Sequence, residues 1–526
     1  MIPARQKLRT FRSQVQYDAV VVGAGHNGLI AAAYLARAGL KVIVLEQREV
    51  VGGAAVTEEL IPGFKVSTAS YSLSLLRPDI YEDLELRRHG LAFYSKDPQM
   101  FVPLPDGRHF FVWRDSTRTA EEIARIHPPD ADAYVKFGEF WDDAVSLLRP
   151  LVESDAPPRL DEVEEYLRSK GREDVWRLAV AGSVAETVEE FFESDEMRGV
   201  FASQGIIGTA ASPRAPGTAW VMAYHYLGGE LNGSTGTWAY VEGGMGSVTS
   251  AIAASARAAG ATILTEANVV EILVESGRAA GVRLHDGVEY RSDVVLSNAD
   301  PVRTFTQLVP SDLLGSEFID KVTRWNTFGS VVKVNLALSE LPDYKAVPGT
   351  VPGPQHFGTL EISPSLHYLE SAWNEAAAGS YPSRPFMEIF IQSATDPSLA
   401  PQGAHVLSAF TQWAPQGKGL SDWSGVKDSI LGNVLATIGE YAPNLPDAVI
   451  AHDVLGPPEL EQRFALTGGN IFHGEILPEQ SFGERFSYET PLPGLYLCGS
   501  GASPGGGVMG AAGRNCARGV LAKLSI

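Results

Sequence analysis

Three glycines and one glutamate in the first fifty residues have the types and the spacing of a dinucleotide site. Gly23, Gly25 and Gly28 form the pattern G-x-G-x-x-G, and Glu46 lies eighteen residues beyond the third glycine. In such sites the first glycine allows a tight turn, the second lets backbone approach a pyrophosphate, and the third lets a helix pack closely on a strand. A carboxylate at this distance accepts hydrogen bonds from the ribose hydroxyls. These four residues therefore predict a bound dinucleotide.

A strand, a helix and a second strand have to hold these residues in place. Residues 20–22 are three valines, which are typical of a buried parallel strand. Residues 29–39 are rich in alanine and leucine and predict a helix that ends near Gly39. Residues 41–46 predict the second strand, which places Glu46 at its carboxyl end. The N-terminus of the helix then offers unpaired N–H groups and partial positive charge to the phosphates.

The bulk composition is that of an acidic globular protein, and the length predicts two domains. The chain has 526 residues, 44% of them hydrophobic, and its 63 acidic and 42 basic residues give a formal net charge of −21. This charge argues against nucleic acid as a partner, because phosphate binding needs clustered positive charge. No window approaches the ~20 consecutive apolar residues of a transmembrane helix. A local peripheral contact with a membrane and the oligomeric state both stay open.

Cysteine content and the first residues bear on the compartment. Cys498 and Cys516 are the only cysteines, which indicates a reducing compartment and predicts a cytoplasmic protein. Residues 1–16 carry four basic residues, no acid and no apolar core, so we expect a short disordered lead-in. The alternative is an organellar presequence, which would place a eukaryotic protein in the mitochondrial matrix. The sequence contains no C-x-x-C and no H-E-x-x-H, so we expect neither disulphide exchange nor a metal site.

Two further glycine-rich stretches accompany the first. Gly52 and Gly53 follow Glu46 in an E-x(5)-G-G pattern, which nicotinamide-binding folds do not need. Later in the chain, a short strand at 495–498 leads into a glycine-dense turn at 499–507, and a helix of small residues is predicted to begin near Val508. Such a turn lets backbone lie against a flat ring, and the helix N-terminus can stabilise negative charge on it.

These stretches resemble the flavoproteins that share a Rossmann half and the E-x(5)-G-G motif, including amine oxidases and carotenoid desaturases. The sequence is most similar to the phytoene desaturase-like (carotenoid/retinoid oxidoreductase) flavoproteins, and within them to the pyridine nucleotide-disulphide oxidoreductase domain proteins. The likeness extends over essentially the whole chain, through "GAGHNGL", "PRAPGTAW", "WAYVEGGMGSV", "LSNADP", "GGNIFHGE" and "GGGVMGAAGRN".

The resemblance implies FAD as the cofactor. The residues expected to bind it are Gly23, Gly25, His26, Asn27, Gly28, Glu46, Gln47, Gly52, Gly53, Ala54, Val269, Asn298, Gly499, Ser500, Gly507, Val508 and Met509. Among them, the resemblance implies that Val269 presents its backbone to the adenine and that Asn298 ends a strand near the cofactor.

The predicted fold is α/β, with a Rossmann-type FAD domain of the amine oxidase or glutathione reductase kind interleaved with an α+β substrate domain. The FAD domain is expected to combine residues 15–70, 240–300 and 465–526, and the substrate domain residues 71–239 and 301–464. Long strands are predicted at 330–339, 386–394 and 405–413, with a helix at 423–441 covering one side. Alternation over residues 332–336 predicts one buried face and one face toward a cavity or solvent.

A competing interpretation concerns the stretch before the helix predicted at 247–259. Gly244-Met245-Gly246, with Glu266 twenty residues beyond Gly246, could form a second site for NAD(P). The preceding "GTWAYVE" is a poor buried strand, and Thr249 occupies the position of the third glycine. The sequence therefore favours the second part of the FAD domain here.

Few polar side chains suggest a catalytic role, as expected when a flavin accepts the hydride and the protein orients the substrate. His473 and His225 are the candidates for acid/base catalysis, and further candidate polar groups are Tyr224, next to His225, and Lys333, on its predicted strand. The alternative for both histidines is a purely structural hydrogen-bonding role.

Three functions remain open at this stage. The first is an FAD-dependent dehydrogenase or desaturase that removes two electrons, as hydride to flavin N5, from a small hydrophobic organic substrate in a long apolar tunnel. The second is an amine-type oxidase that uses oxygen. The third is a lipid-binding chaperone, as the Rab GDP-dissociation inhibitors are on this fold, although the cofactor glycines that those proteins have lost are intact here.

Overall fold

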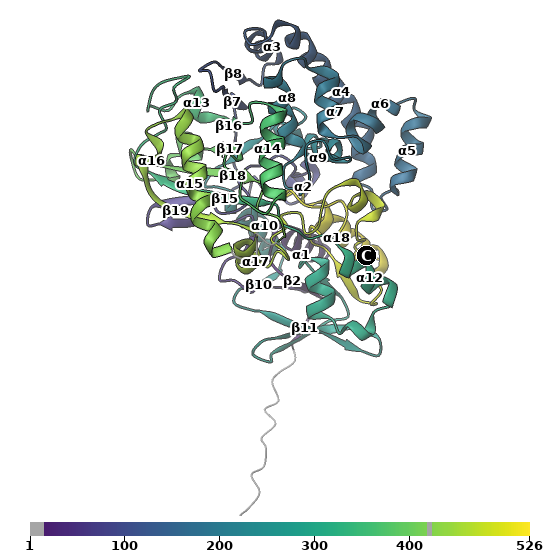
Figure 1. The fold of residues 1–526 in the computed structure, drawn as a ribbon. Helices are drawn as coiled ribbons and strands as arrows, with labels where there is room; N and C mark the ends of the chain where they lie inside the picture. The colour runs from purple at the N-terminus through teal and green to yellow at the C-terminus, as the bar shows by residue number, and fades with distance from the viewer. Residues whose placement is uncertain (1–14, 418–422) are drawn as a thin grey trace, which may run out of the picture.

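The computed structural model describes residues 15–417 and 423–526 and contains a five-stranded parallel sheet (Figure 1). The presequence alternative concerns residues that lie almost entirely outside this range. The strands are ordered β10 (Thr262–Leu264), β3 (Val42–Leu45), β2 (Ala19–Val22), β14 (Val295–Ser297) and β20 (Leu495–Leu497). All neighbours are parallel, so the turns that follow β2, β3 and β14 lie at one edge of the sheet. The predicted α/β, Rossmann-type fold is confirmed.

Both faces of this sheet are buried, as its valine-rich strands require. On one face, Ala19 and Val21 pack in a core with three helices rich in small residues, α1 (His26–Arg37), α10 (Gly246–Ala258) and α18 (Ala511–Leu524). On the other face, Val20 and Val22 pack against a second, four-stranded sheet. Its order is β1 (Val15–Gln16), β13 (Glu289–Arg291), β12 (Arg278–Leu284) and β11 (Val269–Glu275).

A seven-stranded, mostly antiparallel sheet forms a separate layer. Its order is β19 (Val449–Leu455), β15 (Val331–Leu338), β18 (His405–Gln412), β17 (Phe386–Phe390), β16 (Thr359–Ile362), β7 (Met100–Pro103) and β8 (His109–Val112). The helix α15 (Trp423–Tyr441) covers one face, where Ile430 and Val434 pack in the same core as Val332 and Val334. The predicted helix at 423–441 is therefore present with the predicted bounds.

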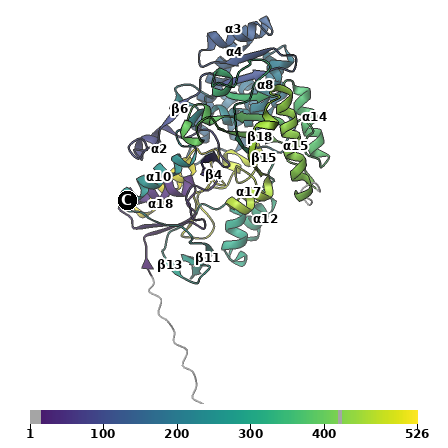
Figure 2. The same ribbon diagram turned by 90° about the vertical axis from the view of Figure 1, so that its left-hand side faces the viewer.

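A helical region lies beside this sheet, on the side of the molecule away from β11 and β13 in both views (Figures 1 and 2). It consists of α3 (Ser116–Ala124), α4 (Pro128–Val152), α5 (Leu160–Ser169), α6 (Glu173–Trp176), α7 (Val184–Phe191), α8 (Asp195–Ala202) and α9 (Thr218–Tyr226). Its core is aromatic, with Phe137 of α4 against Trp141, Phe192 and Phe201 at ring-centroid distances of 5.1–6.0 Å.

The remaining elements are short connections. They are the hairpin β4 (Thr57–Ile61) and β5 (Phe64–Ser67), the pair β6 (Phe93–Ser95) and β9 (Ala239–Val241), and the helices α2 (Pro78–Asp83), α11 (Pro301–Arg303), α12 (Ser316–Arg324), α13 (Pro354–Phe357), α14 (Leu366–Ala377), α16 (Leu445–Ala448) and α17 (Pro457–Phe464). Within the two described ranges, no helix combines the length and apolar composition needed to cross a bilayer.

The start of one helix differs from the prediction, whereas the strand β15 agrees with it in having one face toward the core and one toward a cavity. The helix α18 begins at Ala511 rather than near Val508, because Gly507, Val508 and Gly510 have φ values of +87°, +60° and +84°, which are incompatible with a right-handed helix. In β15, all eight residues are buried, so neither face meets solvent. The polar face of that strand packs against residues 67–69 and, at Lys333, lines a cavity.

Candidate functional site

The glycine turn between β2 and α1 is built as its spacing predicts. Gly23 has a φ of +92°, which only glycine adopts without strain, and its N–H donates to the Leu45 carbonyl at 2.8 Å. A Cβ at residue 28 would lie 2.3 Å from the Gly23 carbonyl oxygen. The third glycine therefore brings the first turn of α1 directly onto the loop and leaves its N–H groups free to face a ligand.

Glu46 follows β3 and turns back to the same loop. One carboxylate oxygen accepts the Ala24 N–H at 2.7 Å, and the other accepts the Arg48 N–H at 2.9 Å. Burial raises the pKa of this carboxyl, and these backbone hydrogen bonds oppose that rise. The carboxylate is thereby fixed beside the glycine turn, where a ribose would bind.

The C-terminal glycine-dense turn is held against the first loop by side chains. Asn27 donates from Nδ2 to Ser500 Oγ at 3.2 Å and accepts the Gly513 N–H at 3.3 Å. Tyr224 donates its hydroxyl proton to the Gly506 carbonyl at 2.9 Å. The sequence pattern assigned no such linking role to either side chain.

Arg485 anchors the same turn and was missed in the sequence. Its buried guanidinium donates to four backbone carbonyls, those of Phe472, Glu475, Gln480 and Ser500. Burial lowers its pKa to about 10, so it remains protonated at neutral pH. No local motif marks this arginine; its role depends on carbonyls that only the tertiary structure brings together.

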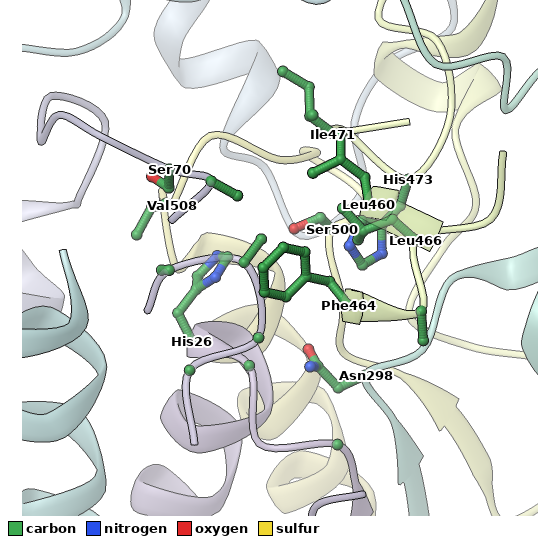
Figure 3. A pocket seen from close by; sticks show the side chains of 18 of the residues that line it. His26, Ser70, Asn298, Leu460, Phe464, Leu466, Ile471, His473, Ser500 and Val508 are labelled. Carbon is green, nitrogen blue, oxygen red and sulfur yellow. The ribbon is translucent and has the colours of Figure 1, made fainter. Parts of the chain in front are cut away.

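A cavity of about 250 Å³ lies where these loops meet (Figure 3). Apolar side chains from residues 460–472 form one wall of it. Among the residues predicted to bind the cofactor, those that line it are Gly23, Gly25, His26, Glu46, Gln47, Gly52, Gly53, Ala54, Val269, Asn298, Ser500, Gly507 and Val508. The first loop thus shares one cavity with residues 267–269 and 298–299 and with Ser500, Gly507 and Val508.

Four other predicted residues lie behind the cavity lining. Gly28 permits the contact between α1 and the loop, and Asn27 joins that helix to Ser500. A Cβ at residue 499 would lie 2.6 Å from the Asn298 carbonyl oxygen, so Gly499 is a close-packing position. Met509 is buried, and its carbonyl accepts the Arg77 N–H at 3.2 Å. We assign these four to building the site rather than to lining it.

The architecture fits the FAD that the resemblance implies. A backbone loop without side chains, a helix N-terminus and an anchored carboxylate are the donor and acceptor set for a pyrophosphate and a ribose. His26 Nε2 and His473 Nδ1 are buried polar atoms in this region with no hydrogen-bond partner, as expected where a polar ligand belongs.

His473 and His26 lie on opposite sides of the ring of Phe464 as seen in Figure 3. Burial lowers the pKa of His473 to about 4, and burial together with His473 lowers that of His26 to about 3. Both imidazoles are therefore neutral at neutral pH. His473 also has a φ of +60°, and its carbonyl accepts the Trp325 indole N–H at 3.1 Å.

His225, the second catalytic candidate, lies on α9 at the wall between two cavities. Its Nδ1 lies 2.8 Å from the Val221 carbonyl and 3.2 Å from the Gln204 carbonyl. Because carbonyls only accept, Nδ1 carries the proton and Nε2 is left as an acceptor. Burial lowers the pKa of His225 to about 4.

Lys333 of β15 also lines the first cavity. Its ammonium donates to the Ser67 carbonyl at 2.9 Å and to the Ala69 carbonyl at 3.2 Å, and it lies 5.0 Å from the ring centroid of Tyr71. Burial lowers its pKa to about 7. A charged residue in a strand that has only one other polar residue, Asn335, is the signal that singles this lysine out in the sequence.

A second cavity, of about 520 Å³, adjoins the first. Tyr71, Ser72, His225 and Trp238 line both. The outer end opens beside α4, where Val135 is 45% exposed. Trp141, Phe137, Tyr134 and Tyr226 form aromatic walls.

The inner end of this second cavity is polar, which the expected apolar tunnel did not include. Lys96 and Glu388 both line it and are only 4% and 6% exposed, and Gln204 and Thr359 lie beside them. No sequence motif predicts this group. The one available signal was Glu388 in the apolar strand "FMEIF".

Contacts resolve the alternative that the sequence left open at residues 244–246, and burial describes the two cysteines. The interpretation of residues 244–246 as a second NAD(P) site is wrong, because the N–H groups of Met245 and Gly246 donate to Ser67 Oγ and Thr57 Oγ1, at 3.0 and 2.9 Å. Neither that turn nor the exposed Glu266 lines either cavity. Cys498 and Cys516 are both buried and unbridged, and burial raises the pKa of each thiol, so neither is a reactive thiolate.

Known proteins resemble this chain in sequence and in fold. Residues 28–521 match the family model described as flavin containing amine oxidoreductase. The chain is 41% identical to pyridine nucleotide-disulfide oxidoreductase domain-containing protein 2 of Mus musculus, over 98% of this chain and 94% of the mouse protein. It is 25% identical to a limonene dehydrogenase subunit of Castellaniella defragrans, over 97% of this chain and 95% of that one. Cyclohexylamine oxidase from Brevibacterium oxydans shares the fold, with a TM-score of 0.60 at 18% identity over 97% and 100% of the two chains.

Proposed function

The chain belongs to the family of flavin-containing amine oxidoreductases, and from that premise we propose that it removes two electrons from an organic substrate held in the second cavity. FAD is its cofactor, and the chain is an FAD-dependent oxidoreductase. The observation that carries the proposal is the wall shared by the two cavities. Tyr71, Ser72, His225 and Trp238 line both, so a substrate in the second cavity can meet a flavin in the first.

Each part of the first cavity has a role in this proposal. Glu46 binds the ribose, and the turn at residues 23–28 holds the pyrophosphate. The turn at residues 499–507, which Arg485 and Tyr224 fix in place, supports the flavin ring system. Leu460, Phe464 and Ile471 exclude water from it. When bound, FAD supplies the hydride acceptor at its N5 atom.

We propose a dehydrogenase or desaturase type of reaction, in which the substrate loses a hydride and a proton. The aromatic walls of the second cavity hold an apolar body. His225 is placed to take up the proton, since its Nδ1 is engaged by carbonyls and its Nε2 is a free acceptor at neutral pH. A relative whose name describes part of a dehydrogenase supports this type of reaction over an oxidase that uses oxygen. Membership of an enzyme family makes the non-catalytic lipid chaperone the weaker alternative.

An anaerobic absorption spectrum of the purified holoprotein tests the proposal. Organic substrates with an apolar body should bleach the flavin bands, whereas NADH and NADPH should leave them unchanged, because the turn at 244–246 is already occupied by side chains of this chain. Bleaching by a nicotinamide cofactor would contradict the proposal. If an organic donor reduced the flavin of the His225→Gln variant as fast as that of the wild type, His225 would have no part in the proposed reaction.

A further inference from the structure

The inner end of the second cavity presents a cation and a carboxylate that are not paired with each other. The Lys96 ammonium donates to Thr359 Oγ1 at 2.7 Å and lies 5.2 Å from the ring centroids of both Tyr240 and Phe390. Among the described residues no carboxylate is in salt-bridge contact with it, although Glu388 and Glu361 attract the ammonium from a longer distance. An ammonium carries three N–H donors, so Lys96 has capacity beyond the bond to Thr359.

Glu388 is the facing carboxylate. Tyr71 donates its hydroxyl proton to one carboxylate oxygen at 3.0 Å, and Gln204 donates from Nε2 to the other at 3.2 Å. Each carboxylate oxygen has more than one lone-pair site, so Glu388 can accept a further hydrogen bond. Glu361 lies behind it outside the cavity lining, and burial followed by repulsion from Glu388 raises the pKa of Glu361 well above its ordinary value. Burial lowers the pKa of Lys96 and raises that of Glu388, and the attraction between the two groups opposes both shifts, so they form one buried pair of a donor and an acceptor.

The place of this pair in the cavity ties it to the proposed reaction. Tyr71, which donates to Glu388, also lines the flavin cavity, and so does the neighbouring Ser72. The solvent end lies beside Val135 and Glu139 of α4. A substrate whose apolar body lies along the aromatic walls would therefore place any polar group at the end nearest the flavin.

The chemistry of the pair selects among polar groups. An ammonium on the substrate would be attracted by Glu388 but repelled by Lys96, and a carboxylate would be attracted by Lys96 but repelled by Glu388, so the pair offers neither charge a net gain to offset its loss of hydration in a buried site. An uncharged group that both accepts and donates satisfies both partners. We propose that the inner end of the second cavity binds the hydroxyl group of an alcohol, which accepts from Lys96 and donates to Glu388. This inference rests on the proposed function, because it takes the second cavity as the substrate site.

Binding of three matched probes to the FAD-loaded protein tests the inference. Cinnamyl alcohol, cinnamylamine and cinnamate share one apolar body and differ in the head group. Their affinities are measured by the change in the flavin absorption spectrum in the absence of oxygen. The wild type should bind the alcohol about tenfold more tightly than either charged probe, a difference of about 1.4 kcal/mol.

Two substitutions should shift the preference in opposite directions. Lys96→Met removes the repulsion of the amine and should make cinnamylamine the preferred probe. Glu388→Gln removes the repulsion of the carboxylate and should make cinnamate the preferred probe. Because each variant gains affinity for one probe, a protein that merely fails to fold cannot imitate the result. Lys136→Met and Glu121→Gln change exposed residues outside the cavity lining and should keep the wild-type order.

Tightest wild-type binding of the amine or the carboxylate, or no binding of any probe, would overturn the inference. So would variants that keep the wild-type order. Flavin bleaching by organic donors is a separate readout. A protein that shows the expected probe preferences but is reduced by no donor would contradict the proposed oxidoreduction and leave the hydroxyl site standing.

Discussion

Single residues decide whether the cofactor loop can form, and Gly28 is the sharpest case. A Cβ there would lie 2.3 Å from the Gly23 carbonyl oxygen and 3.1 Å from the Asn298 side chain, which leaves little room to adjust. We expect Gly28→Ala to lower the free energy of unfolding by about 1–3 kcal/mol and to reduce the FAD content of the purified protein. Chemical denaturation and the ratio of flavin to protein absorbance measure the two effects.

Gly432→Ala is the matched control for that change. Gly432 lies in α15, and a Cβ there has open space. Alanine is the better helix former, so this variant should be as stable as the wild type or more stable, by up to about 1 kcal/mol. A Gly28→Ala protein with full flavin content would contradict the assigned close contact.

The buried histidines make the stability of the protein depend on pH at the residue scale. The pKa of His225 is lowered from 6.5 to about 4, so between these values the unfolded chain binds more protons than the folded one. Stability therefore falls as the pH drops from about 6.5 to about 4, and His225 alone accounts for a loss of about 3 kcal/mol across that window.

Urea denaturation at a series of pH values checks this expectation. His225→Gln should lower the slope of the free energy of unfolding against pH in that window by up to about 1.4 kcal/mol per pH unit, which corresponds to one bound proton. His367→Gln, at an exposed position of α14, should leave the slope unchanged. Equal slopes in the wild type and in His225→Gln would mean that His225 is not buried in its neutral form.

At the scale of elements, the turn at residues 499–507 depends on Arg485. Replacing it with methionine leaves the carbonyls of Phe472, Glu475, Gln480 and Ser500 without this donor. We expect Arg485→Met to lower the free energy of unfolding by about 2–4 kcal/mol and to speed FAD release, as measured by denaturation and by flavin fluorescence. Arg485→Lys should recover part of both, because an ammonium still offers three donors.

The exposed Arg324 of α12 provides the comparison for that experiment. Arg324→Met should match the wild type in stability and in the rate of FAD release. If Arg485→Met released FAD no faster than Arg324→Met, the turn would not depend on the guanidinium.

The elements also show what a sequence can and cannot predict. The strand β2, the helix α1 and the strand β3 follow from local patterns, since burial on both faces and a glycine turn leave a direct trace in residue types. The start of α18 does not, because positive φ at Val508 is imposed by the surrounding turn. The pair of Lys96 and Glu388 was missed for a different reason. They come from segments distant in sequence, and only the tertiary fold brings them to one cavity.

At the scale of the whole molecule, FAD should stabilise segments that are remote in sequence. The five strands of the parallel sheet come from residues 19–45, 262–297 and 495–497, so the sheet joins three regions that are far apart in the sequence. At a free FAD concentration of 100 times Kd, we expect about 2.7 kcal/mol of added stability. Calorimetry should show it as an upward shift of one transition.

Riboflavin, which lacks the pyrophosphate and the adenosine, is the control ligand and should shift the transition much less. Two separate transitions, of which FAD moves only one, would contradict a sheet that unfolds as a unit. In that case the strands from residues 262–297 would have to stay folded after the strands that pair with them had unfolded.

The order of the strands has a consequence for synthesis on the ribosome. The strand β14 lies between β2 and β20, so its second neighbour is absent until residue 497 has been made. At about 5–20 residues per second, β14 waits roughly 10–40 s for that strand. Throughout this time the Gly23 loop exists without the segment that closes the other side of the pocket. Flavin capture is therefore a late event, and the nascent chain must carry an unfinished, apolar sheet edge, the kind of surface that molecular chaperones bind.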